Sequence, residues 1–312
     1  MITKVQTATL TREEWLDLRR NSIGGSDAAA IVGLNEFSSP YSVWADKMGL
    51  LPEKDDSEAM RQGRDLEQYV AERFEEATGK RVRRCNYIIY NDEYPFAHAN
   101  VDRLVIGEDA GLECKTTSIM NPCRWADGEY PSNYYVQCQH YMAITGKSKW
   151  YLAVLVLNRG FYYYTIDRDE REIAALMAAE SSLWDCVKNK TQPPIDGERA
   201  TTEALSVIYA DGVPKSCIEL YGREYTIQNM MRLKDQIKDL EKQVAEFENE
   251  LKADMGENET GFAGDFKVSW KMQERNSFDA KRFAEEHPGM DLSAYYKKSA
   301  FRSFKVTKRK GA

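Results

Sequence analysis

The sequence predicts an α/β fold for most of the chain, followed by a mainly helical C-terminal appendage. Three observations support this prediction. Amphipathic helical segments with capping residues alternate with short apolar β segments up to about residue 190. Pro193 and Pro194 then interrupt the pattern, and the composition changes beyond Ile195. We therefore predict one domain over residues 1–195 and an appendage over residues 196–312.

The composition is that of a globular protein in a reducing compartment. The 312 residues are 42% hydrophobic and 30% charged, which is sufficient for a sizeable core. No apolar run reaches membrane-spanning length and the N-terminus lacks the apolar core of a signal peptide, so we expect a cytoplasmic protein without a membrane partner. Six cysteines without a Cys-x-x-Cys spacing argue against a zinc site or an iron–sulfur cluster. The net charge of −7 means that any DNA-binding surface must be local.

Two helices separated by a glycine pair open the chain. Thr11 is a predicted N-cap, Glu14 completes a capping box, and this helix runs to Arg20. A second helix follows Gly24 and Gly25, with Ser26 as its predicted N-cap and Gly33 after its end. Free amide groups at a helix start, with Arg19 nearby, would form an anion site. A tight turn in which Ser26 is only a cap accounts for the same residues.

The next helices carry apolar faces at helical spacing. Pro40 opens a helix after Ser39, in agreement with the preference for proline at the first helical position. A long helix over residues 57–78 places Leu66, Tyr69, Val70 and Phe74 on one face, and Gly79 follows it. Glu67 borders that face. It would be a solvated glutamate unless the helix packs against the following hairpin.

The remaining elements of the first domain alternate between strands and helices. We predict strands over residues 81–90, 149–157 and 161–166, a short helix opened by Asn121 and Pro122, and helices over residues 133–145 and 168–189. Gln137 and Tyr141 are neighbours on the 133–145 helix because they are four residues apart. A buried amide needs partners, and a phosphate or a metal-bound water would provide them.

A predicted β-hairpin organises these elements. Apolar runs over residues 101–106 and 112–116 flank a turn from Gly107 to Gly111. Side chains alternate along a strand, so Glu113 and Lys115 share one side, and the hairpin brings Asp102 back toward them. Two carboxylates are ligands suited to Mg²⁺, and a lysine beside them completes a set for metal-assisted phosphodiester hydrolysis. A surface hairpin with solvated charges has the same spacing.

The C-terminal appendage has its own patterns. Residues 223–253 carry apolar residues at alternating steps of three and four, a heptad pattern that favours a docked or partner-bound helix over a free coiled coil. A hairpin strand over residues 261–272 and a helix over residues 278–286 follow. The tail is basic, with Lys297, Lys298, Arg302, Lys305, Lys308, Arg309 and Lys310 among the aromatic residues Tyr296, Phe301 and Phe304. It is either a solvated tail or a contact for backbone phosphates.

The order of these pieces resembles a known family. The pieces are Arg19 and Ser26, then Glu67 on a helix, then Asp102, then Glu113 and Lys115, then Gln137 and Gln139 on a helix. This order resembles the YqaJ-type viral recombinase nucleases, relatives of phage lambda exonuclease within the PD-(D/E)xK nuclease superfamily. The resemblance covers about residues 10–190 and implies a central mixed β-sheet flanked by helices.

The resemblance also implies a metal site. Asp102 and Glu113 would hold Mg²⁺, for which Mn²⁺ can substitute, helped by the backbone carbonyl of Cys114. Glu67 would assist the metal site. The proline of the superfamily name is Val101 here, a position that only shapes the strand.

Roles for the other residues follow from the same resemblance. Lys115 would position or activate the attacking water, and Gln137 would orient Lys115, the water or the phosphate. Arg19 and Ser26 would match the family's pocket for the 5′-phosphate of a DNA end.

The implied activity is resection of linear double-stranded DNA, 5′ to 3′, in phage-type recombination. Its partners would be DNA ends and a single-strand annealing or recombinase protein, in the cytoplasm of a bacterial host and with a phage or prophage origin. A structure-specific endonuclease on the same core and a non-cleaving DNA-end-binding protein are the alternatives. A homo-oligomer is compatible with the resemblance, but residues 196–312 are absent from lambda exonuclease and leave its ring-shaped trimer open for this chain.

Overall fold

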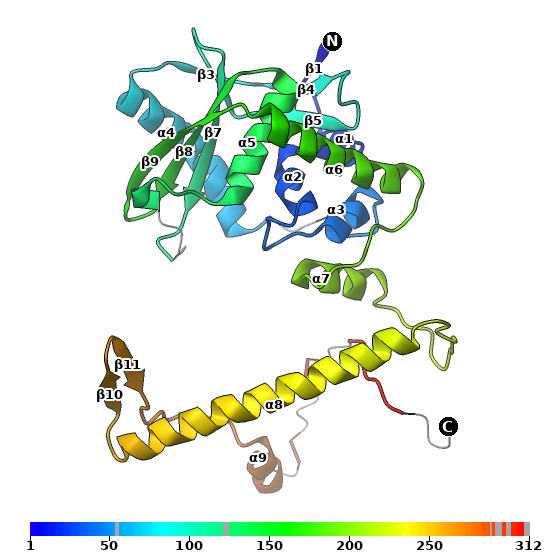
Figure 1. Ribbon diagram of the computed structural model, residues 1–312, viewed down its shortest axis with the longest axis vertical. Helices are drawn as coiled ribbons and strands as arrows, with labels where there is room; N and C mark the ends of the chain where they lie inside the picture. Colours follow the sequence, from blue (N-terminus) through cyan, green and yellow to red (C-terminus); the bar gives the residue numbers. More distant parts are fainter. Residues whose placement is uncertain (54–55, 121–124, 288, 291–294, 298–300, 309–312) are drawn as a thin grey trace. The chain divides into compact units, whose positions relative to one another are not determined.

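The protein consists of two compact units. The computed structural model describes residues 1–312 except 54–55, 121–124, 288, 291–294, 298–300 and 309–312 (Figure 1). The first unit is Met1–Ala210 and the second is Asp211–Ala312. The positions of the two units relative to one another are not determined, so each is described by itself.

Helix α7 (Arg199–Ile208) places the end of the first unit beyond the boundary predicted at residue 195. Ala204 of α7 lies in one apolar cluster with Tyr41 and Trp44 of helix α3 (Pro40–Lys47). Pro193 and Pro194 therefore lie in a connection inside this unit, and the composition change that they mark does not coincide with the unit's end.

The larger sheet of the first unit is mixed, as predicted. In the described part of the chain it has five strands in the order β3, β6, β7, β8, β9. These are β3 (Val82–Arg84), β6 (Arg103–Val105), β7 (Ala110–Thr117), β8 (Lys149–Val156) and β9 (Gly160–Asp167). β7 pairs antiparallel with β6 and parallel with β8. The predicted hairpin is confirmed, with Leu112 opposite Arg103.

A smaller sheet lies beside it in the same unit. Its strands, among the described residues, are β1 (Ile2–Gln6), β4 (Tyr87–Asn91), β5 (Ala97–Asn100) and β2 (Ile23–Gly24). The single strand predicted over residues 81–90 is wrong, because β3 pairs with β6 in the larger sheet whereas β4 pairs with β5 in the smaller one. The chain passes from one sheet to the other at Cys85 and Asn86, whose backbone groups bond outside both ladders.

Capping residues set most helix boundaries where the sequence predicts them. The other helices of the first unit are α1 (Arg12–Arg20), α2 (Gly25–Ile31), α4 (Glu58–Thr78), α5 (Ser132–Thr145) and α6 (Glu170–Lys188), with a 3₁₀ turn η1 (Trp125–Asp127). Thr11 and Glu14 form the predicted capping box of α1. Ser57 caps α4, which ends at Gly79 with a φ of 70°. The predicted helix start at Asn121 and Pro122 lies outside the described residues.

Helices α4 and α5 cover opposite faces of the larger sheet (Figure 1). Phe74 of α4 packs in one apolar cluster with Leu112 and Tyr151 of the sheet. Met142 of α5 packs in another cluster with Trp150. Because neighbouring residues of a strand point to opposite faces, the two clusters take alternate residues of β8.

The second unit is built around one long helix. It contains α8 (Glu224–Met255), the hairpin of β10 (Thr260–Ala263) and β11 (Phe266–Ser269), and α9 (Ala280–Glu286). The long helix, the hairpin and the short helix are therefore confirmed. Of the predicted basic tail, Lys298, Arg309 and Lys310 lie outside the described residues. Among the described residues of both units, no helix has both the length and the apolar character needed to cross a membrane.

Candidate active site

Strand β7 presents a carboxylate and an amine toward helix α5. Leu112 packs on the α4 side of the sheet, so Glu113 and Lys115 point to the α5 side. The Lys115 Nζ lies 2.6 Å from Oε1 of Glu113. The Glu113 side chain is only 4% exposed. The predicted sharing of one strand face by these two residues is confirmed.

Asp102 joins this pair through the hairpin. It lies one residue before β6, and its Oδ2 accepts a hydrogen bond from the backbone N–H of Cys114 at 2.8 Å. Burial raises the pKa of Asp102 well above its usual range, and the Glu113 carboxylate raises it further. The two carboxylates therefore repel each other across a small volume, as the hairpin geometry predicted.

Lys115 is held as a cation. Burial alone would lower its pKa, but the carboxylates of Glu113 and Asp102 outweigh burial and raise the pKa above the usual range of lysine. Its Nζ also lies 5.1 Å from the ring centroid of Tyr134, a cation–π distance. Trp125 stacks on Tyr134 in turn, with an interplanar angle of 26°. Lys115 in this arrangement donates hydrogen bonds and does not accept a proton.

Gln137 of α5 fixes the orientation of Glu113. Its Nε2 donates to Oε1 of Glu113 and to the hydroxyl of Tyr141, both at 2.8 Å. Gln137 and Tyr141 are neighbours on the helix, as their spacing predicted, and both are buried. Gln137 therefore contacts Glu113 directly, at the same oxygen that lies beside the Lys115 ammonium.

The second oxygen of Glu113 lacks a hydrogen-bond partner. Among the described residues, Oε2 of Glu113 is one of the few buried side-chain oxygens without one. A buried carboxylate oxygen without a partner is costly, and a bound ion would satisfy it. Asp102 lies close to Glu113, so the donor set here is two carboxylates, the oxygen ligands that suit Mg²⁺ or Mn²⁺. The residues present fit a divalent metal ion.

Glu67 lies at the border of this site and is held by an arginine. Helix α4 packs on the face of the sheet opposite Glu113. Oε1 of Glu67 accepts a hydrogen bond from Arg103, whose side chain is 3% exposed and which also donates to Gln68 at 3.1 Å. In the described part of the chain, no three His, Cys, Asp or Glu side chains gather as a metal-binding cluster. Glu67 therefore lies near the carboxylates of Asp102 and Glu113 but does not form a three-residue metal-binding cluster with them.

Arg19 and Ser26 meet, although the predicted cap is wrong. Nη2 of Arg19 donates to Oγ of Ser26 at 3.1 Å. Helix α2 begins two residues earlier than predicted, and its N-cap is Gly24, whose N–H donates to Oδ2 of Asp27 at 3.0 Å. Ser26 thus lies in the first turn, which leaves its hydroxyl for Arg19. Gly33, with a φ of 73°, follows the helix as predicted.

A buried ion pair supports Arg19 and Ser26. Nζ of Lys47, whose side chain is 3% exposed, lies 2.7 Å from Oδ2 of Asp27 and donates to the backbone oxygen of Arg19 at 2.8 Å. Burial alone would raise the pKa of Asp27, but Lys47 outweighs it and lowers the pKa. Lys47 therefore connects the end of α1 to the start of α2.

Sequence reasoning missed the residues that hold the predicted ones in place. Arg103, Tyr134 and Lys47 contact the site residues from other elements. Arg103 directly follows Asp102, and this adjacency is a signal that could have identified it. Lys47 lies in the mostly buried helix α3, and lysine side chains are usually exposed, so the burial of Lys47 depends on tertiary packing.

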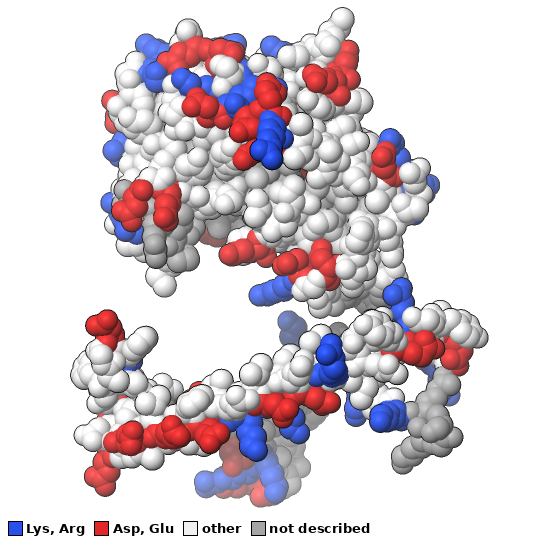
Figure 2. Space-filling model, viewed as in Figure 1, with Lys and Arg blue, Asp and Glu red and all other residues white. Residues whose placement is uncertain are grey.

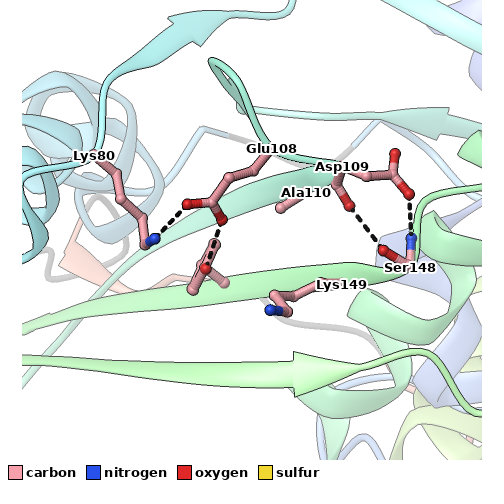
Figure 3. A pocket seen from close by; sticks show the side chains of 7 residues that line it. Lys80, Glu108, Asp109, Ala110, Ser148 and Lys149 are labelled. Atoms are coloured by element: carbon pink, nitrogen blue, oxygen red, sulfur yellow. Dashed lines mark hydrogen bonds and ion pairs between the residues drawn. The ribbon is translucent and has the colours of Figure 1, made fainter.

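The hollow in Figure 3 lies elsewhere, at the beginnings of β7 and β8. It has a volume of about 330 Å³, and Glu113 and Lys115 are not among its lining residues. Two of its charged residues, Lys80 and Glu108, pair with each other. Glu108 accepts from Lys80 and from Tyr151, and Asp109 accepts from the backbone N–H of Ser148 at 3.0 Å. We assign no function to this hollow.

The fold and the site thus define an α/β protein with two carboxylates and a cationic lysine on one sheet face. Comparison with known families gives a match to the YqaJ-like viral recombinase domain over residues 14–148. The chain is also 39% identical over 306 residues to the uncharacterized protein YqaJ of Bacillus subtilis, covering 96% of each protein. The chain belongs to the YqaJ-like viral recombinase family, as the order of its motifs predicted.

Solved structures with partial similarity include two exonucleases. The alkaline exonuclease LHK-Exo of Laribacter hongkongensis matches with a TM-score of 0.48 and 22% identity, covering 57% of this chain and 93% of that one. A phage-related exonuclease of Haemophilus somnus 129PT matches with a TM-score of 0.45 and 13% identity, covering 56% of this chain and 99% of that one.

Proposed function

We propose that this chain is a Mg²⁺-dependent exonuclease that resects linear double-stranded DNA from its 5′ end, with Mn²⁺ as a substitute metal. One observation carries the proposal. Oε2 of Glu113 is buried without a hydrogen-bond partner beside Asp102 and the cationic Lys115. A divalent metal ion and a phosphate would together satisfy all three groups. Membership in a viral recombinase family supports a DNA substrate.

The chain's own residues would prepare the phosphodiester for hydrolysis. Asp102 and Glu113 would hold the metal, with the Cys114 carbonyl between Glu113 and Lys115 on the same strand. The bound metal would supply electrostatic stabilisation of the charge that develops on the phosphate oxygens. The Lys115 ammonium would donate to the attacking water or to a phosphate oxygen, since its raised pKa keeps it protonated.

Gln137 and Glu67 would act on the edge of this site. The Gln137 amide occupies Oε1 of Glu113, so the other carboxylate oxygen remains available. Glu67 would assist through its charge, since Arg103 holds its carboxylate near Asp102. Gln137 and Glu67 would therefore affect how the carboxylates of Asp102 and Glu113 hold the metal.

Arg19 and Ser26 would select the DNA end. The Arg19 guanidinium and the Ser26 hydroxyl lie within hydrogen-bond distance of each other, and both can donate to a phosphate. A terminal 5′-phosphate carries more negative charge than an internal phosphodiester, so this pair favours an enzyme that begins at an end. The single strand exposed by resection would pass to an annealing or recombinase protein.

The test is a cleavage assay with the purified full chain. Linear duplexes with a 5′-phosphate or a 5′-hydroxyl, each labelled at one end, are incubated with Mg²⁺, with Mn²⁺ or with a chelator, beside a closed circle. We expect degradation of the linear DNA only, from the 5′ end, faster with the 5′-phosphate, and none with the chelator. Cleavage of the circle would replace the proposal with the endonuclease. Binding without cleavage would replace it with the end-binding protein.

Two pairs of variants assign the residues. Lys115→Gln should abolish cleavage and leave DNA binding intact, whereas Lys147→Gln, at a partly exposed lysine paired with Asp109, should leave both unchanged. Arg19→Gln should remove the preference for the 5′-phosphate. Arg20→Gln changes the neighbouring arginine, which pairs with Asp17, and should keep that preference. Equal behaviour of Arg19→Gln and Arg20→Gln would contradict the end-binding role of Arg19.

A further inference from the structure

Helix α8 of the second unit carries an exposed apolar stripe. Its members are Leu233, Ile237, Leu240, Val244, Phe247 and Leu251, each between 44% and 65% exposed among the described residues. They recur at steps of three and four along a helix of 32 residues. Figure 2 shows this part of α8 as an uncoloured band bordered by charged residues. A stripe of this length on a long helix marks an interaction surface.

We propose that this stripe pairs with the same stripe of a second copy of the chain, as a parallel two-stranded coiled coil. The identities of the core residues indicate this occupant. In heptad notation Ile237 and Val244 take position a, and Leu233 and Leu240 take position d, so the pattern holds over these two heptads before Phe247 at d and Leu251 at a. A β-branched residue at a with leucine at d favours two parallel strands over three or four.

The surface of α8 has a shallow hollow along this stripe. It measures about 320 Å³, and its lining is Ile237, Leu240, Glu241, Val244, Ala245 and Glu248, all from this one helix. The first four residues occupy positions a, d, e and a of successive turns. In a parallel pair, those four positions form the hole that receives a d side chain, here the partner's Leu240.

The flanking residues are compatible with the same arrangement. In a parallel pair, position g of one helix faces position e of the next heptad in its partner. Gln236 would face the partner's Glu241, and Gln243 would face the partner's Glu248, so an amide donates to a carboxylate in both cases. No two like charges meet at these positions. An antiparallel pair that layers Leu240 on Val244 would instead bring Glu241 close to the partner's Glu241.

The mass of the full chain in solution tests the pairing. Light scattering after size exclusion, at micromolar concentration, should give twice the 35.8 kDa of one chain. Leu240→Glu places a carboxylate in the core and should weaken the association at least tenfold. Asn249→Glu makes the same change of charge on the outer face of α8 and should leave the mass unchanged. Circular dichroism checks that both variants keep their helix content.

A cysteine crosslink tests the parallel orientation independently. The background is Cys217→Ser, because Cys217 is an exposed native thiol. Val244→Cys should then form a disulfide between two copies on mild oxidation, because identical a residues meet in a parallel pair. Asn249→Cys, on the outer face, should form much less. A monomeric chain, a trimer, equal masses for Leu240→Glu and Asn249→Glu, or a dimer without the Val244→Cys crosslink would each overturn the proposal.

Discussion

Gly25 lies directly against the ring of Tyr141, where a Cβ added to the glycine would be 2.5 Å from Cε1 of the tyrosine. The Tyr141 hydroxyl accepts a hydrogen bond from the same Gln137 amide that donates to Glu113. Gly25 is also the residue before Ser26, which binds Arg19. This glycine–tyrosine contact therefore connects the Arg19 and Ser26 pair to the carboxylate of Glu113.

Gly25→Ala should destabilise the protein through this contact. The nearest atoms belong to a buried ring, so helix α2 or Tyr141 must move, and overpacking of this kind costs about 1–3 kcal/mol. Urea unfolding followed by circular dichroism measures the loss. The matched control is Gly63→Ala in α4, whose added Cβ would lie 3.8 Å from Oγ1 of Thr116. That control should gain about 0.5–1 kcal/mol from helix propensity, and equal effects of the two changes would contradict a tight contact at Gly25.

Gln137→Leu should raise the Mg²⁺ concentration needed for cleavage. The change removes the donor that fixes Oε1 of Glu113, and loss of a group that orients a metal ligand typically costs about 10–100-fold in metal affinity or activity. Cleavage rates across a Mg²⁺ titration measure it. Gln139→Leu is the same change two residues later, where the amide donates to Tyr135 and to the backbone oxygen of Asp167. Its Mg²⁺ requirement should match that of the unchanged chain, and a shift as large as for Gln137→Leu would argue for a general effect on α5.

Local signals predicted the elements better than the contacts between them. Capping residues such as Thr11 and Ser57 act within one turn of helix, so the sequence places those boundaries correctly. Alternation along β7 likewise placed Glu113 and Lys115 on one face. Strand β1, in contrast, lies at the edge of a sheet and is mostly exposed. It therefore lacks the alternation of buried and exposed side chains by which a strand is predicted.

Contacts that depend on tertiary packing were out of reach of the sequence. Ser26 fits the composition of an N-cap, but the N-cap is Gly24, and the carboxylate of Asp27 is held between Lys47 and the N–H of Gly24. The pairing of Glu67 with Arg103 is another contact that the sequence does not predict. Whether a helical glutamate faces solvent or a buried arginine depends on which face of the sheet the helix covers.

Arg103→Met should cost about 2 kcal/mol of folding free energy, less than the 3–5 kcal/mol of a fully buried ion pair, because Glu67 retains some solvent contact. The change leaves Glu67 and Gln68 without their donor. Urea unfolding measures it. Arg84→Met is the control, since Nη2 of Arg84 lies 3.9 Å from the same carboxylate but is 57% exposed. Exposed pairs contribute about 0.2–1 kcal/mol, so a control as costly as Arg103→Met would show that burial of the arginine is unimportant.

His98→Gln should make the stability of the protein less sensitive to acid. Burial, reinforced by the Lys47 ammonium, lowers the pKa of His98 from 6.5 to about 3. Between these values the unfolded chain binds a proton that the folded chain does not. The free energy of unfolding therefore decreases as the pH is lowered below 6.5, by up to about 1.4 kcal/mol per pH unit. This loss continues until His98 is also protonated in the folded protein.

Glutamine keeps a polar group near Ser22, which lies 2.8 Å from Nδ1 of His98, but cannot titrate. Its free energy of unfolding, from urea titrations between about pH 4.5 and 6, should decline less steeply by roughly 1 kcal/mol per pH unit. His287→Gln, at an exposed histidine after α9, serves as the control and should keep the original slope. If His98→Gln kept that slope as well, the histidine would already be protonated in the folded protein, and its burial next to Lys47 would have to be relieved at low pH.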